Sequence, residues 1–102
     1  MAAKKYEVKW TINAHEDYER ILYYLLSEWS LNVVENFMLA SETRIYDLSF
    51  QPFIGKVSAR DKNVRSILLS KHNRLYYRIQ NNIIELLDIF DTRQAPERNK
   101  FE

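Results

Sequence analysis

Residues 64–91 read VRSILLSKHNRLYYRIQNNIIELLDIFD, and they predict the central part of a β-sheet. It is rich in β-branched, leucine and aromatic residues and is interrupted twice by short polar turns, which predicts strands over residues 64–70, 74–80 and 83–92. The Asn-Asn pair at 81–82 separates the last two runs, and asparagine tolerates the positive φ that a type I′ hairpin requires at both central positions. We therefore expect a three-stranded antiparallel meander.

The segment before the meander predicts a strand and a first helix. YEVKWTI, residues 6–12, alternates apolar with polar side chains, which is typical of a half-buried strand. Asn13 precedes Glu16 by three residues, as in a capping box, and apolar residues then recur at helical spacing. We expect a helix over residues 14–29 with Asn13 as its N-cap.

A second helix is expected over residues 31–49, capped by Ser30 or by Asn32. Pro52 ends it, and Gly55, the only glycine of the chain, suits a turn that needs positive φ. The two helices form a hairpin whose apolar stripes must be buried on one face of the sheet. The predicted fold class is therefore α+β: an N-terminal strand, an antiparallel helical hairpin and a three-stranded meander, packed as a two-layer sandwich.

Length and composition limit the class of protein. With 102 residues, 46% of them hydrophobic, the chain is expected to form a single domain, residues 1–102, with a polar tail over residues 93–102. It has no cysteine, one glycine and two isolated histidines, so we expect no metal site, no glycine-rich phosphate loop and no cofactor. No signal peptide or membrane span is recognisable, which predicts a cytoplasmic protein.

Charge is divided unevenly along the chain. Residues 1–50 carry five basic and eight acidic side chains, whereas residues 51–102 carry ten basic and six acidic ones. A basic second half favours an acidic partner, either a nucleic acid or an acidic protein segment.

The sheet face opposite the helices is expected to be open, and it carries the candidates for function. Alternation along residues 74–80 places apolar side chains on one face and Arg74, Tyr76 and Arg78 on the other. Guanidinium groups bind phosphate or carboxylate, and a tyrosine ring can stack on a base. Basic residues of the polar loop before the meander and of the tail extend this predicted anion-binding or target-binding site. Its predicted members are Lys56, Arg60, Lys62, Arg65, Arg74, Tyr76, Arg78 and Arg93.

The alternative is a solvated sheet face whose arginines have structural partners. Glu85, Asp88 and Asp91 lie on the neighbouring predicted strand, where they can form cross-strand ion pairs with the arginines. Two or three arginines on an exposed strand are ordinary, so composition leaves both interpretations open.

In order and spacing, these segments resemble the RelE/ParE superfamily of bacterial type II toxins, also known as plasmid stabilisation proteins. The resemblance covers about residues 6–98 and implies growth inhibition as the activity. It rests on YEVKWTINAHEDYERILYYL (6–25), FQPFIGK (50–56), VRSILL (64–69), HNRLYYRI (72–79) and IIELLDIFDTRQAP (83–96), which is similar to the family's final strand ending in an arginine before a proline.

The resemblance implies one of two activities. One branch consists of ribosome-dependent mRNA endoribonucleases, whose basic residues promote attack by a 2′-hydroxyl and stabilise the phosphorane. Arg65, Arg74 and Arg93 match basic positions of that branch and would be its catalytic residues. The ParE-like branch poisons DNA gyrase. Ribonuclease relatives often have a tyrosine or histidine near the C-terminus, and QAPERNKFE (94–102) contains neither, which favours the ParE-like branch, with the ribonuclease as the alternative.

Either branch implies a cognate antitoxin as a partner. The target is a further partner: DNA gyrase or, in the alternative, the ribosome and mRNA. Antitoxins of this superfamily wrap the toxin with an extended or helical segment, so we expect a partly apolar groove between the hairpin and the sheet. The basic second half favours an acidic antitoxin segment.

Overall fold

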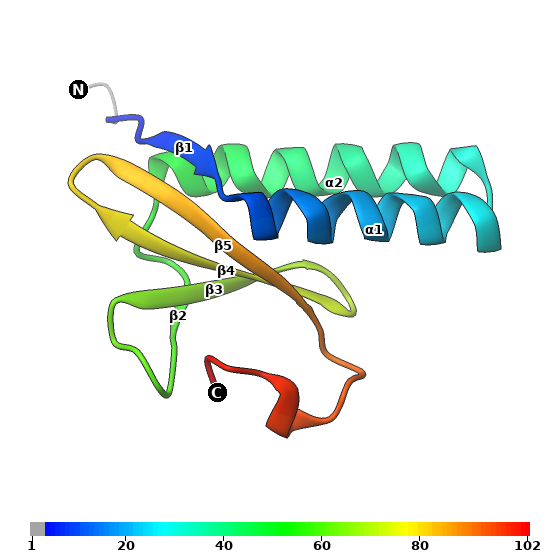
Figure 1. The fold of residues 1–102 in the computed structure, drawn as a ribbon. Coiled ribbons are helices and arrows are strands. Elements are labelled where there is room, and N and C mark those ends of the chain that lie inside the picture. The colour runs from blue at the N-terminus through cyan, green and yellow to red at the C-terminus, as the bar shows by residue number, and fades with distance from the viewer. Residues whose placement is uncertain (1–3) are drawn as a thin grey trace.

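Two helices pack on one face of a five-stranded sheet in the computed structural model, which describes residues 4–102 (Figure 1). Residues 1–3 of the predicted domain lie outside the described residues. The sheet order is β1-β5-β4-β3-β2, and the α+β fold class is confirmed. In chain order the elements are β1 (Glu7–Trp10), α1 (Ile12–Glu28), α2 (Leu31–Phe50), β2 (Lys56–Val57), β3 (Val64–Ser70), β4 (Asn73–Gln80), β5 (Ile83–Asp91) and a short 3₁₀ helix (Pro96–Arg98).

The meander forms the centre of the sheet, with β4 paired antiparallel to both β3 and β5. β1 pairs in parallel with β5, and β2 adds a short antiparallel edge to β3 inside the segment that we expected to be a loop. The turn between β4 and β5 differs from the prediction, because among the non-glycine residues from 4 to 102 only Asn81 has positive φ, 58°. A type I′ turn needs positive φ at two positions, so that prediction is wrong.

The N-cap of α1 is Thr11, and the prediction of Asn13 is wrong. The Thr11 hydroxyl accepts a hydrogen bond from the Ala14 amide at 3.2 Å and lies 2.7 Å from the Leu86 carbonyl, to which it donates. One side chain therefore both begins the helix, at Ile12, and ties that beginning to β5. For α2 the N-cap is Ser30, one of the two predicted residues, whose hydroxyl accepts from the Val33 amide.

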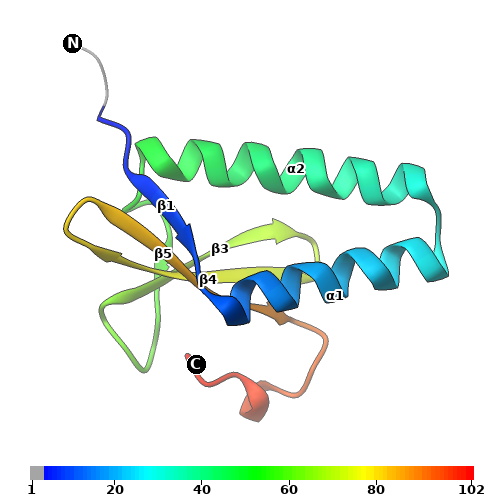
Figure 2. The same ribbon diagram turned by 45° about the horizontal axis from the view of Figure 1, so that its top comes forward.

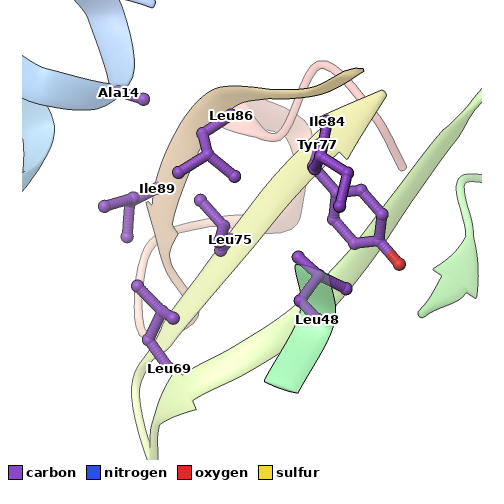
Figure 3. Close-up of a cluster of buried hydrophobic side chains, with 8 residues drawn as sticks. All are labelled: Ala14, Leu48, Leu69, Leu75, Tyr77, Ile84, Leu86 and Ile89. Carbon is purple, nitrogen blue, oxygen red and sulfur yellow. The ribbon is translucent and has the colours of Figure 1, made fainter. Parts of the chain in front are cut away.

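The core lies between the helices and the sheet (Figure 3). Its buried side chains come from α1, α2, β3, β4 and β5. They are Ala14, Leu48, Leu69, Leu75, Tyr77, Ile84, Leu86 and Ile89. At the bulge of β5 opposite Tyr76 and Tyr77, the carboxylate of Asp17 accepts a hydrogen bond from the Ile89 amide at 2.9 Å, so α1 also anchors the irregular part of this strand.

Close packing, rather than a backbone angle, explains Gly55. Its φ is not positive, so the predicted positive-φ turn is wrong. A Cβ at this position would lie 2.3 Å from the Tyr77 hydroxyl oxygen and 2.9 Å from the Ser66 carbonyl oxygen. The Gly55 amide donates to the Tyr77 hydroxyl at 3.0 Å, and that hydroxyl donates to the Pro52 carbonyl at 2.7 Å. The absence of a side chain thus lets the segment before β2 sit directly on Tyr77.

The second face of the sheet is covered, which corrects the expectation that it stays open. Both ribbon views place the C-terminal segment on the side of the sheet away from the helices (Figure 1 and Figure 2). We call residues 96–102 the strap. Tyr76, which we expected to project into solvent, is wholly buried beneath it.

Candidate functional site

Strand alternation divides the predicted site residues between the two faces of the sheet. Arg65 of β3 is the register partner of Tyr77, whose side chain lies in the core, so Arg65 belongs to the helix side. Ser66 is the partner of Tyr76, and both lie on the strap side. Arg65 and Arg74, which we expected to surround one basic concavity, therefore lie on opposite faces.

Arg65 supports the chain segment next to Gly55. Its guanidinium donates to the carbonyl of Phe53 at 3.1 Å and to the carbonyl of Gly55 at 2.9 Å, and lies 5.4 Å from the centre of the Phe53 ring. These contacts fix the segment that leads into β2. Arg65 thus positions Lys56 through the backbone and does not itself enter the strap-side site.

A cavity of about 530 Å³ on the strap side brings together three of the predicted cations, Lys56, Arg60 and Arg74. The strap contributes two carboxylates to the same wall, those of Glu97 and Glu102. Arg74 is oriented by a hydrogen bond of 2.9 Å from its guanidinium to the Ser66 hydroxyl. The other residues that line the cavity are Tyr76, Phe90, Thr92, Gln94, Pro96 and Asn99.

Tyr76 forms the floor beneath the strap. Phe101 stacks on its ring with 4.6 Å between the ring centres and 26° between the planes. The side-chain amide of Asn99 donates to the Tyr76 hydroxyl at 2.8 Å. Burial raises the pKa of Tyr76, so the phenolate that a general base requires is disfavoured. In this structure Phe101 occupies the ring that we expected to be an open stacking surface.

Two other predicted arginines are held in ion pairs. Arg78 pairs with Glu85 across β4 and β5 at 2.8 Å. Arg93 pairs with Asp91 at 2.8 Å, and its hydrogen bonds hold the pKa of the Asp91 carboxyl below its usual value. The structural interpretation of the arginines therefore applies to these two, and neither lines the cavity of Lys56, Arg60 and Arg74. Lys62 lies in the exposed turn between β2 and β3.

Sequence reasoning missed the residues that build the covering. Asn99, the one buried residue of the strap, was treated as part of a polar tail. Ser58, which is buried, and Phe101, which is half-buried, were missed in the same way. The available signal was Phe101 itself, because it is the single aromatic residue of the tail over 93–102.

Two further observations concern residues 4–102 alone. Neither α1 nor α2 is long and apolar enough to cross a membrane, and these residues contain no group of three or more histidine, cysteine, aspartate or glutamate side chains arranged to hold a metal ion.

Comparison with known proteins identifies the family. The family described as the ParE toxin of the type II toxin-antitoxin system, parDE, matches residues 8–96. No curated protein sequence matches the chain significantly.

Solved structures share the fold at low sequence identity. The chain is similar to the chromosomal ParDE TA system from P. aeruginosa, with a TM-score of 0.72 and 16% identity over 87% of this chain and 98% of that one. It is similar to the toxin-antitoxin complex RelBE2 from Mycobacterium tuberculosis, with a TM-score of 0.59 and 22% identity over 85% and 98%. The YoeB/ParE toxin from Agrobacterium tumefaciens gives a TM-score of 0.62 and 16% identity over 83% and 97%.

Proposed function

The chain belongs to the family of ParE toxins of type II toxin-antitoxin systems, and we propose that it inhibits DNA gyrase by binding and is neutralised by a cognate antitoxin. The main support for the proposal is that the residues a ribonuclease would need do not lie together in one site. Arg65 lies on the helix side of the sheet, and Arg93 is bound by Asp91 outside the cavity. Tyr76, which lies beside the cations, is buried with a raised pKa.

The second candidate is a ribosome-dependent endoribonuclease, and one observation favours it. Lys56, Arg60 and Arg74 line one cavity, and three cations can bind a phosphodiester and stabilise the charge of a phosphorane. Cleavage also requires a group that protonates the leaving 5′ oxygen. The strap supplies Glu97 and Glu102 to the cavity, and these carboxylates would repel the phosphate that the cations attract.

The apolar side chains at the free end of the helical hairpin support an antitoxin contact. Figure 1 shows this end of α1 and α2 extending past the sheet. Trp29 is 68% exposed and Leu31 is 61% exposed, although side chains of this kind are normally covered. We propose that the antitoxin covers them with the apolar face of a helical or extended segment.

One pair of assays separates the two candidate activities. Purified chain at micromolar concentration is expected to inhibit supercoiling of relaxed plasmid by gyrase, and addition of the antitoxin is expected to restore it. In a parallel ribosome translation assay, mRNA is expected to stay intact. The antitoxin to use is the product of a short neighbouring reading frame, if it binds the chain on co-expression.

A matched pair of arginine variants gives the control. Arg74→Ala removes a cation of the cavity. Arg44→Ala removes an exposed cation of α2, a helix that does not line the cavity. The gyrase proposal would be replaced by the ribonuclease under two conditions. The wild-type chain would leave supercoiling unaffected and cleave mRNA, and this cleavage would be lost in Arg74→Ala but kept in Arg44→Ala.

A further inference from the structure

The strap is held by a few specific side-chain contacts near its end. The segment that connects it to β5 is exposed. Residues 92–98 are exposed, and Asn99 is the only buried residue from 92 to 102. A segment with so little buried surface opens at a far lower free-energy cost than the core does. The strap is therefore the part of the sheet's covering that can leave without unfolding the rest.

Four contacts along the strap recognise four different chemical groups. The Asn99 amide bonds to the Tyr76 hydroxyl at 2.8 Å, and the Lys100 ammonium pairs with Asp88 at 3.0 Å. The Phe101 ring stacks on Tyr76, as described above. The Glu102 carboxylate accepts from the Ala59 amide at 3.1 Å, and the Tyr76 hydroxyl lies 3.4 Å from its other oxygen.

The strap's main chain is bound as well. The Arg60 amide donates to the Phe101 carbonyl at 3.3 Å, and the Ser58 hydroxyl donates to the same carbonyl. The Arg60 guanidinium donates to the main-chain oxygen of Glu102 at 2.6 Å. Main-chain hydrogen bonds that give affinity, combined with side-chain contacts that give specificity, are the means by which proteins bind extended peptides.

We propose that the surface formed by Tyr76 and residues 58–60 is a peptide-recognition site for an acidic segment of a partner protein. The segment must place an aromatic side chain directly before a carboxylate, as Phe101 and Glu102 do. In the free chain the strap occupies this site and competes with the partner. The proposal goes beyond the proposed function, since it does not depend on whether the target is gyrase or the ribosome.

Charge supports an acidic peptide over other occupants. Lys56, Arg60 and Arg74 line the cavity next to the Glu102 subsite, so added carboxylates of a partner would meet cations there. A peptide is favoured over a nucleic acid because the Arg60 amide and the Ser58 hydroxyl both meet a peptide carbonyl. Asp88, the partner of Lys100, would also repel a phosphate.

The test measures binding of a fluorescent peptide with the sequence of residues 96–102, PERNKFE, to the full-length chain by fluorescence anisotropy. In wild-type chain the strap blocks the site. In Phe101→Ala the strap loses its stacking contact, so the site is open in a larger fraction of molecules. Because the apparent affinity scales with that fraction, we expect Phe101→Ala to bind the peptide at least about tenfold more tightly than wild type. Tyr23→Ala, which removes an aromatic side chain that is 71% exposed on α1, in the layer on the other side of the sheet from the strap (Figure 1), is expected to bind like wild type.

Further variants identify the recognised groups. In the Phe101→Ala chain, Tyr76→Phe keeps the ring but removes the hydroxyl that contacts Asn99 and Glu102, so peptide binding is expected to weaken severalfold. A peptide in which alanine replaces the phenylalanine is expected not to bind. Thermal unfolding of each variant verifies that the fold is retained.

Three results would overturn the proposal. The first is equal peptide affinity in wild type and Phe101→Ala, which would mean that the strap does not cover the site. The second is failure of the peptide to bind folded Phe101→Ala chain at concentrations up to about 1 mM. The third is preference of the Phe101→Ala chain for a single-stranded oligonucleotide over the peptide, which would assign the surface to nucleic acid.

Discussion

The contact between Gly55 and the Tyr77 hydroxyl predicts a strong coupling between two substitutions. Tyr77→Phe leaves the Gly55 amide and the Pro52 carbonyl without their partner, and both residues are buried. An unsatisfied buried group costs about 1–3 kcal/mol, so we expect Tyr77→Phe to lower the free energy of unfolding by about 2–4 kcal/mol. Gly55→Ala is expected to cost at least as much, because its Cβ would stand 2.3 Å from the same hydroxyl oxygen.

The double variant is expected to be less destabilised than the sum of the two single variants. Once the hydroxyl is absent, the hydrogen bonds are already lost and the Cβ has more room, so we expect the coupling to recover about 1–3 kcal/mol. Urea unfolding followed by circular dichroism measures all four proteins of the cycle. Combining Gly55→Ala with Tyr18→Phe, whose hydroxyl bonds to Ser41, provides the additive control. Additivity within about 0.5 kcal/mol in the Tyr77 cycle would refute the reasoning, because the glycine would then serve some purpose other than access to this hydroxyl.

Three further predictions concern other contacts of the fold. Asp17→Ala removes the acceptor of the Ile89 amide at the bulge, and we expect it to lower the free energy of unfolding, measured by urea unfolding, by about 1–3 kcal/mol. The control is Glu16→Ala, a change at the neighbouring exposed residue, which is expected to alter that free energy by less than about 0.5 kcal/mol. Burial raises the pKa of Tyr77 above its ordinary value of 10.0, so the stability due to its neutral form is complete below that pH and is lost as the pH rises through the folded-state pKa. Unfolding measured across alkaline pH is expected to show this loss in wild type and a shallower one in Tyr77→Phe, and equal slopes would contradict the assignment. Arg93→Ala is expected to leave the urea midpoint unchanged, since its ion pair is at the surface, and a clear shift would reveal a structural role that the contacts do not indicate.

The fold could be predicted from sequence because its signals are local. Alternation within β4 and helical spacing within α1 and α2 each depend on residues a few positions apart, and the elements follow in the predicted order. The covering of the second sheet face depends on residues far apart, since Asn99 and Tyr76 are separated by 23 positions and Phe101 and Ser58 by 43. Alternation assigns Tyr76 to the face away from the helices, and it contains no information on what lies above that face.

The same distinction explains why the glycine and the arginines were misinterpreted. Gly55 was assigned to a turn because glycine often has positive φ, whereas its reason is a contact with a tyrosine 22 positions away. Arg65 was grouped with Arg74 by charge, although the register of β3 and β4 separates them by the thickness of the sheet. A candidate site inferred from residue types therefore needs the strand register before its members can be counted together.

The remaining cations favour recognition over catalysis. Lys56 and Arg74 can attract an anion, and Arg60 already binds the main chain of the strap. Tyr76, which lies beside them, has a pKa raised by burial and donates its hydroxyl toward Glu102 beneath a stacked Phe101. A surface that combines fixed positive charge with aromatic and peptide contacts can select a partner. Opening of the strap would enlarge this binding surface, because it would uncover the Tyr76 ring and the groups of residues 58–60 that bind the strap.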